Sequence, residues 1–232
     1  MSRRLVLLDI DGTLVSAGRI SARVFGEALL EAFGTTGDAD SFDYSGKTDP
    51  QIVRELMKGA GFTDQEIEKR RPRALEDYRE RLAVSIRPEH VAPKPGMGPL
   101  LEALDREPDV TLALLTGNLE STARLKLEPV DANRYFPFGA FGSDDEDRYR
   151  LPPVALERAR VEAGHAFEGK EIVIVGDSVH DVLCGRDLGV RAVAVATGRT
   201  SAERLAETGP DALLPDFSDT GATVAAVLAL TW

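Results

Sequence analysis

Short runs of valine, leucine and isoleucine constrain the fold of this 232-residue chain more than any other feature of its sequence. None of the runs alternates cleanly between apolar and polar residues, so each is typical of a strand that is buried on both faces of a sheet. The four clearest runs are Leu5–Ile10, Val110–Leu115, Ile172–Val175 and Val190–Val195. We therefore expect at least four strands inside a covered sheet.

Segments with helical periodicity lie between these runs. Strands that alternate with helices favour a parallel sheet with helices on both faces, so we predict an α/β fold with a Rossmann-like core. Toward the C-terminus the pattern continues, and Ala212–Leu214 is typical of a short edge strand. The expected helices are Gly98–Leu104, Ser121–Leu127, Pro152–Gly164, Val179–Leu188, Ser201–Thr208 and Ala222–Leu230.

One long segment interrupts this alternation, because it contains helical patterns and no convincing strand. Its helices are expected at Arg19–Phe33, from Asp49-Pro50, and from the capping-box pair Thr63 and Glu66 to about Val84. A helical block inserted after the first strand of such a core is typical of a cap or lid. We predict a core domain of residues 1–15 and 93–232 and an all-helical cap domain of residues 16–92.

Composition excludes several classes of protein. The chain has 28 Lys and Arg against 39 Asp and Glu, and its pI near 4.8 disfavours a surface for nucleic acid or anionic membranes. The single cysteine, Cys184, excludes an internal disulfide framework and a multi-cysteine zinc site. No apolar run reaches the length of a membrane span, and the first one predicts a strand rather than a signal peptide. We expect a cytoplasmic protein without nucleic-acid or membrane partners.

Acidic side chains follow the first expected strand directly, in the sequence Asp9-Ile10-Asp11-Gly12-Thr13. Ligands of open α/β sheets bind beyond the carboxyl ends of the strands, which places these residues for chemistry. Carboxylates two residues apart on an extended path point to the same side, and they need a counter-cation or a proton to coexist. The alternative is a strand that simply runs into an acidic turn.

Two further polar groups follow later strands. Thr116-Gly117-Asn118 offers a hydroxyl and backbone N–H groups that suit a phosphate cradle, although the same tripeptide also forms ordinary turns. Asp177 suits an oxygen ligand of Mg²⁺, or else the N-cap of the next helix. Asp181, one helical turn later, could orient a cation or a bound water.

In combination, these groups resemble the motifs of the haloacid dehalogenase-like hydrolase superfamily, and specifically of its phosphatases. The first motif matches Asp9 to Thr13, the second matches Thr116, and the fourth matches Gly176, Asp177 and Asp181. The resemblance covers nearly the whole chain. The helical insert is similar to the family's cap of the first type, as in phosphoglycolate phosphatases and β-phosphoglucomutases.

The third motif of the family is where this sequence departs. The family supplies a Lys or Arg before a core helix, whereas this region reads Asp147-Arg148-Tyr149-Arg150-Leu151-Pro152-Pro153 without a lysine. Either Arg148 or Arg150 could hold a phosphate oxygen with its guanidinium, and the other would then be a surface residue. We prefer Arg148 slightly.

The resemblance implies phosphoryl transfer through a covalent aspartyl-phosphate, with Asp9 as nucleophile and Asp11 as general acid and then base. It also implies a Mg²⁺ cofactor held by the Asp9 side chain, the Asp11 backbone carbonyl and Asp177. Phosphate oxygens would be held by one arginine, by Thr116, and by the backbone N–H groups of Gly117 and Asn118.

The expected partner is a small phosphorylated substrate, and phosphoglycolate, a sugar phosphate and a nucleotide are all open. Lys47 of the cap could contact the anionic leaving group, or it could merely precede a helix. Lys94 is a weaker candidate of the same kind. A mutase similar to β-phosphoglucomutase and a non-catalytic phosphate-binding module are the alternatives. A monomer would be sufficient for the chemistry, and a homodimer is not excluded.

Overall fold

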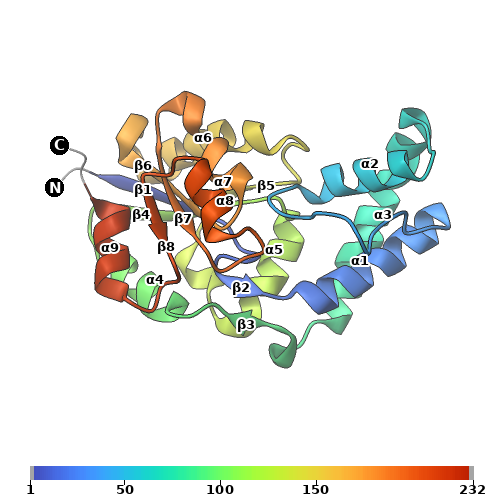
Figure 1. Cartoon of the computed structure of the whole chain (residues 1–232), viewed down its shortest axis with the longest axis horizontal. Helices are drawn as coiled ribbons and strands as arrows, with labels where there is room; N and C mark the ends of the chain where they lie inside the picture. Colours follow the sequence, from blue (N-terminus) through green and yellow to red (C-terminus); the bar gives the residue numbers. More distant parts are fainter. Residues whose placement is uncertain (1–2, 230–232) are drawn as a thin grey trace.

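The computed structural model describes residues 3–229 and is centred on a six-stranded sheet (Figure 1). Every pairing between its neighbouring strands is parallel, so the predicted α/β fold is confirmed. In sheet order the strands are β5 (Gly139–Phe141), β4 (Val110–Thr116), β1 (Arg4–Leu8), β6 (Ile172–Gly176), β7 (Arg191–Val195) and β8 (Ala212–Leu214).

Successive residues of each strand point to opposite faces of the sheet, so both faces are apolar and both are covered by helices. Val6 and Leu8 of β1 join one apolar cluster with α4, α5 and α9, whereas Leu5 and Leu7 join another with α6. Residues of α7 and α8 pack on β7. These helices are α4 (Met97–Asp105), α5 (Glu120–Leu127), α6 (Leu151–Ala163), α7 (Val179–Leu183), α8 (Ala202–Glu207) and α9 (Thr220–Leu228).

Some elements differ from the sequence-based expectation. β5 was not expected, because three residues at a sheet edge are too few to leave a periodic signal. α7 stops at Leu183 instead of continuing to Leu188, and a 3-10 turn over Arg186–Leu188 follows Gly185. Gly185 is packed so closely against the sheet that a Cβ there would lie 2.5 Å from Ile174. The expected helix Ala222–Leu230 corresponds to α9, and Leu230 lies outside the described residues.

Three α-helices within residues 16–92 lie beside the core, on the right of Figure 1. They are α1 (Gly18–Phe33), α2 (Asp49–Gly59) and α3 (Asp64–Ser85). The rings of Phe25 and Tyr78 meet edge to face across α1 and α3, with centroids 5.0 Å apart. The capping box of Thr63 and Glu66 is present at the start of α3. These three helices are the ones that the sequence predicted for this segment.

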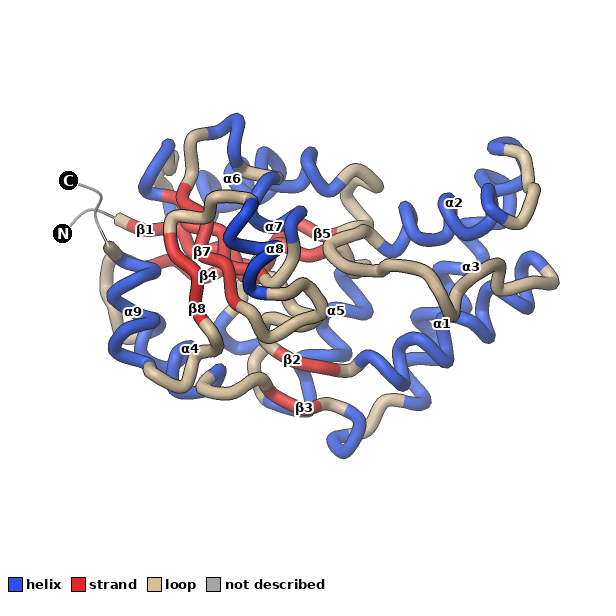
Figure 2. Tube along the Cα trace, in the orientation of Figure 1, coloured by secondary structure: helices blue, strands red, loops and turns tan. Residues whose placement is uncertain are grey.

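A pair of two-residue strands connects the helical block to the core. β2 (Val15–Ser16) and β3 (Ala92–Pro93) pair in the antiparallel direction where the chain leaves the core and returns to it (Figure 2). The sequence did not indicate them, because two residues leave no periodic pattern and the partner is far away in the chain. The division into a core of residues 1–15 and 93–232 and a cap of residues 16–92 stays a prediction, and this pair lies across its boundary.

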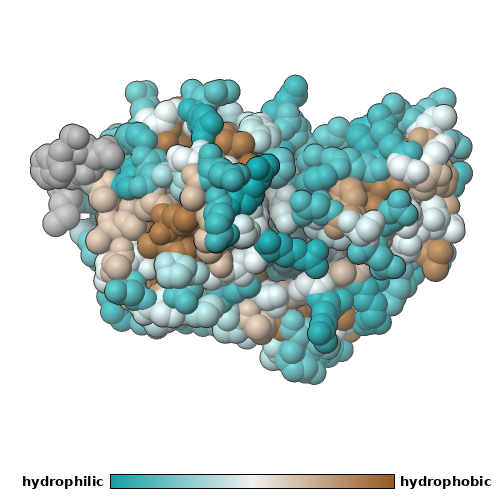
Figure 3. Space-filling view, in the orientation of Figure 1, coloured by the Kyte–Doolittle hydropathy of each residue, from teal (hydrophilic) through white to brown (hydrophobic). Residues whose placement is uncertain are grey.

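Hydrophilic side chains cover most of the face of the molecule in Figure 3, and apolar side chains appear there only in small groups. Among residues 3–229, we find no helix that is long and apolar enough to span a bilayer.

Gly96 fixes the point at which the chain returns to the core and begins α4. Its φ of 78° lies in the left-handed region, and a Cβ there would lie 1.9 Å from the backbone oxygen of Phe217. The backbone N–H of Phe217 donates to the carbonyl of Pro95, which holds the two segments together. Only glycine satisfies both the backbone conformation and the close approach.

We predict that Gly96→Ala lowers the free energy of unfolding by at least about 2 kcal/mol, because the backbone or the Phe217 segment must shift. Gly98→Ala is the matched control, since a Cβ at Gly98 meets nothing within 4 Å and alanine favours the helix. Denaturant unfolding of both variants measures the difference. Equal stability of the two variants would contradict the prediction.

Asp49 joins the helical block to the core at the start of α2. Its backbone N–H donates to the carbonyl of Gly117 at 2.7 Å, and its carboxylate accepts the N–H of Leu119 at 2.9 Å. Gly117 lies so close to this loop that a Cβ there would be 2.1 Å from the Lys47 carbonyl oxygen. Burial raises the pKa of the Asp49 carboxyl to about 6, although Lys126 and the Leu119 N–H favour its charged form. The junction therefore carries a carboxylate that is costly to ionise.

This burial predicts a pH-dependent penalty at Asp49. The folded-state pKa lies above the ordinary value of 3.8, so the penalty is absent below pH 4, grows as the pH rises to about 6, and is constant above. Asp49→Asn should therefore gain stability relative to the wild type between pH 4 and pH 7, by about 3 kcal/mol at most. Denaturant unfolding across this range tests the prediction, with the exposed Asp187→Asn as control. A difference between Asp49→Asn and wild type that does not change with pH would contradict it.

Candidate active site

A cavity of about 560 Å³ lies between the carboxyl edge of the sheet and the helical block. The ends of β1, β4 and β6 contribute one wall, and α1, α3 and the loop before α2 contribute the other. Residues from distant parts of the chain meet there because parallel strands all end at the same edge of the sheet. This cavity contains most of the site residues that the sequence singled out.

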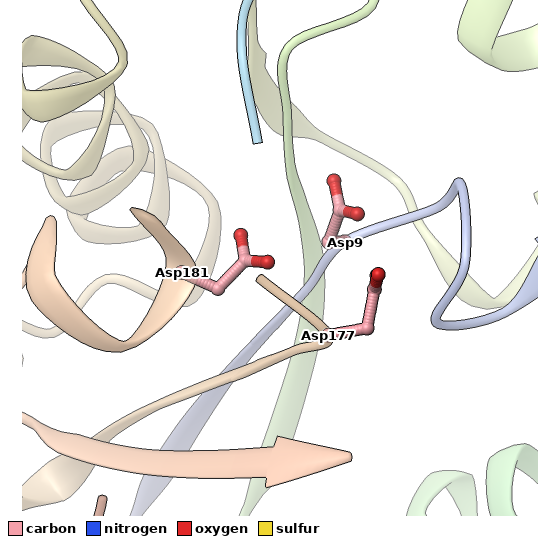
Figure 4. A group of neighbouring side chains, drawn as sticks. All are labelled: Asp9, Asp177 and Asp181. Carbon is pink, nitrogen blue, oxygen red and sulfur yellow. The ribbon is translucent and has the colours of Figure 1, made fainter. Parts of the chain in front are cut away.

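Three buried carboxylates meet at one end of the cavity (Figure 4). Asp9 directly follows β1, Asp177 directly follows β6, and Asp181 lies in α7. One oxygen from each lies within 4.8 Å of the other two. Burial, followed by the charge of Asp181, raises the pKa of Asp9 to about 7, and burial together with Asp9 raises the pKa of Asp177. Such a group needs positive charge nearby, and its oxygen donors fit a hard divalent cation such as Mg²⁺.

Arg148 supplies a buried positive charge to this group. Its Nη2 donates to Asp9 Oδ1 at 3.2 Å, to the Leu115 carbonyl at 3.2 Å and to Asp181 Oδ1. Burial opposes its charge, but Asp181 and Asp9 outweigh that effect and raise the pKa of Arg148. Its Nε is buried without a hydrogen-bond acceptor among residues 3–229.

Arg150, the other arginine considered for the third motif, lies outside the cavity. Its side chain is 73% exposed, and its guanidinium lies 3.8 Å from Asp145 at the surface. The two arginines separate because Arg148–Arg150 is a 3-10 turn that directs neighbouring side chains to different sides. The structure therefore brings Arg148, and not Arg150, to the carboxylates.

Asp181 and Asp177 differ in how their oxygens are used. Asp181 accepts the N–H and the hydroxyl of Ser178 with one oxygen and Arg148 with the other, so both oxygens have donors. Asp177 accepts the Thr13 hydroxyl at 2.8 Å with Oδ1 only. A Cβ at Gly198 would lie 1.6 Å from the other oxygen, so the loop after β7 covers Asp177 closely. Asp181 thus orients Arg148, while Asp177 keeps an oxygen for a cation.

The polar residues that follow β4 line the same cavity. Thr116 is fully buried, and its Oγ1 accepts the side-chain amide of Asn118 at 2.8 Å. Gly117 and Asn118 also line the cavity. The Thr116 hydroxyl hydrogen is not needed for the bond with Asn118, so it can be donated to a ligand. The three predicted cradle residues lie together at the end of β4.

Asp11 lies at the side of the cavity that faces the helical block, and it contacts a lysine that sequence reasoning missed. Lys126 Nζ lies 2.6 Å from Asp11 Oδ2 and 2.5 Å from Asn118 Oδ1. Burial opposes its charge, but Asp11, Tyr78 and Asp49 raise the pKa of Lys126. Lys126 falls within the expected helix Ser121–Leu127, and a lysine between Leu125 and Leu127 in a helix that packs on the sheet was the available signal.

Lys47 and Lys94 both line the cavity, as the sequence suggested, and both have partners. The Lys47 ammonium pairs with Glu55 and lies 4.4 Å from the centroid of the Phe42 ring. Lys94 donates to the backbone carbonyl of Thr197 at 2.6 Å. The loop of Thr197, Gly198 and Arg199 was also missed, although it follows an expected strand and so could have been inferred from the same edge rule.

Comparison with known proteins agrees with this geometry. The chain is 29% identical over 223 residues to phosphoglycolate phosphatase 1 of Pseudomonas aeruginosa, covering 93% of this chain and 78% of that protein. It is 26% identical over 222 residues to pyrophosphatase PpaX of Halalkalibacterium halodurans, covering 94% of this chain and 95% of that protein. The fold matches that of a predicted phosphatase from Clostridium acetobutylicum with a TM-score of 0.74 at 17% identity, covering 97% of this chain and 99% of that one.

The resemblance inferred from the motifs is confirmed at the level of the family. The family model for haloacid dehalogenase-like hydrolases matches residues 6–195, which include the acid pair after β1, the polar residues after β4, Arg148 and the acid pair after β6. The chain therefore belongs to the haloacid dehalogenase-like hydrolase family.

Proposed function

We propose that this protein is a Mg²⁺-dependent phosphatase that hydrolyses a small phosphate monoester through an aspartyl-phosphate at Asp9. One observation carries the proposal. Asp9, Asp177 and Asp181 are buried with oxygens within 4.8 Å of one another, beside a single buried guanidinium, at the edge of the sheet where ligands bind. The curated relatives that are phosphatases by name support the same reaction class.

The chemistry needs a nucleophile, an acid and a base from this chain. An oxygen of Asp9 attacks phosphorus, a new P–O bond forms, and the bond to the ester oxygen breaks. Asp11 gives a proton to the departing oxygen and later takes one from the water that hydrolyses the acyl-phosphate. Bound Mg²⁺ would neutralise charge on the carboxylates and the phosphate, with Asp9, Asp177 and the Asp11 backbone carbonyl as the residues to hold it.

Phosphate oxygens would be held from two directions. Thr116, with the N–H groups of Gly117 and Asn118, lies on one side of the cavity and Arg148 on another. These donors are fixed before substrate arrives, because Thr116 is bonded to Asn118 and Arg148 is bonded to two carboxylates. Preorganised donors stabilise charge that spreads over the equatorial oxygens in the transition state.

The cations around the cavity favour a substrate with a second anionic group. Arg19, Lys47, Lys94 and Arg199 all line the cavity, in a protein whose net charge is −11. The phosphoglycolate and pyrophosphate of the relatives' names both carry a second anion, so phosphoglycolate is the first candidate. All groups of the site come from one chain, so a monomer suffices, and we keep the cytoplasm as the expected location.

The first test of this proposed function concerns Asp9 and the metal. The wild type should release inorganic phosphate from 4-nitrophenyl phosphate with Mg²⁺, and EDTA or Asp9→Asn should reduce the rate by at least about 10³-fold. Asp187→Asn, an exposed carboxylate, is the matched control and should keep wild-type activity. Turnover that survives in Asp9→Asn would exclude the aspartyl-phosphate route. With a sugar added to the assay as acceptor, transfer of the phosphoryl group to a hydroxyl of that sugar would instead indicate a mutase.

The two arginines give a second test of this proposed function. Arg148→Lys keeps the charge but loses the planar donors, so kcat/KM should fall by about 10²-fold. Arg150→Lys should stay within about twofold of the wild type, because the Arg150 guanidinium is solvated. Steady-state kinetics of both variants test this, and equal losses would show that Arg148 has no special role.

A further inference from the structure

We propose that Lys126 is a positioning residue that fixes the carboxyl group of Asp11 for proton transfer to the leaving group. The proposal rests on the phosphatase function proposed above, in which Asp11 is the acid. Lys126 lies outside the four motifs. It is on the second turn of α5, the helix that follows β4, and it lines the cavity.

The contacts of Lys126 point to this role. Two donors reach the same oxygen of Asp11: Lys126 Nζ lies 2.6 Å from Oδ2, and Asn118 Nδ2 lies 2.8 Å from it. Lys126 also donates to Asn118 Oδ1 at 2.5 Å, which closes a ring of three side chains. Among residues 3–229, no donor is bonded to Asp11 Oδ1. The ring therefore fixes one oxygen and leaves the other to exchange a proton in the cavity.

The ring also ties the acid to the phosphate cradle. Asn118 Nδ2 reaches Thr116 Oγ1 as well as Asp11, so the acid and a phosphate donor share one support. A network of this kind holds the reacting groups in fixed relative positions, and small displacements of such groups lower the reaction rate considerably. Lys126 is the positively charged member of the network, and its removal would leave the Asn118 amide as the one remaining donor to Asp11 Oδ2 among residues 3–229.

The burial of the Lys126 ammonium costs free energy, which argues against an incidental position. The residue is 3% exposed, and a buried ammonium is tolerated only where several polar groups satisfy it. Asp11, by contrast, keeps 40% of its side-chain surface exposed to the cavity. Without the lysine, this half-exposed carboxyl would keep only the bond from Asn118, and more orientations would be open to it. The pair thus joins a buried lysine to the carboxyl group of Asp11, which must contact the substrate.

This role predicts a dependence on the leaving group. Phenolate is a basic leaving group that needs a proton as it departs, whereas 2,4-dinitrophenolate departs without one. A misplaced acid therefore slows phenyl phosphate selectively, because kcat/KM compares the free enzyme with the transition state of phosphoryl transfer to Asp9. A merely structural defect would slow both esters equally.

The experiment measures kcat/KM for both esters in Lys126→Met, Lys126→Gln and Lys126→Arg. Lys126→Met should lose about 10²-fold with phenyl phosphate and less than about threefold with 2,4-dinitrophenyl phosphate, and arginine should restore part of the loss. Glutamine keeps a donor and serves if methionine does not fold. Lys94→Met, which removes a cavity lysine that does not bond Asp11, is the matched control and should leave the ratio of the two esters unchanged.

Crystal structures of the methionine and arginine variants give a readout that is independent of turnover. Asp11 should take more than one orientation in Lys126→Met and a single one in Lys126→Arg. Equal losses for both esters, or an unchanged Asp11 in Lys126→Met, would overturn the proposal. Failure of the phosphatase function itself looks different: the wild type would then hydrolyse neither ester, or Asp9→Asn would remain active.

Discussion

The buried guanidinium of Arg148 makes it possible for carboxylates from two separate strands to share one small volume. Asp9 and Asp181 both accept from it, and Asp177 lies within the same 4.8 Å group. Burial, followed by repulsion from Asp181, raises the pKa of Asp9 to about 7. One positive charge does not balance three carboxylates. The remaining deficit is the physical reason that this end of the cavity suits a divalent cation and the anion that the cation attracts.

The same balance of charge governs the side of the cavity that meets the helical block. Lys126 bonds Asp11 of the core, and the charge of Asp49, the first residue of α2, also raises the pKa of Lys126. Asp49 in turn receives the N–H of Leu119, so the residues that hold the acid are next to those that hold the cap. The contacts of Asp11 and the junction with the helical block are therefore next to one another.

Much of the fold could be predicted because its signals are local. Each central strand is a run of apolar residues, and the capping box of Thr63 and Glu66 marks a helix start within four residues. The elements that were missed depend on distant partners: β2 pairs only with β3, and β5 adds three residues to the edge of β4. The premature end of α7 likewise reflects packing of Gly185 against Ile174 of the sheet. No local pattern encodes such contacts.

The sequence by itself indicated the family: Asp9, Asp11, Thr116 and Asp177 stand out by their place at the ends of apolar strands, since parallel strands end at one edge. It left Arg148 and Arg150 open, because a 3-10 turn decides which side chain turns inward. Only the tertiary structure placed Lys126 beside Asp11 and Gly198 over Asp177. The first contact joins residues more than a hundred positions apart, and the second joins residues about twenty apart. The energies of both arise from burial and charge that exist only once the chain is folded.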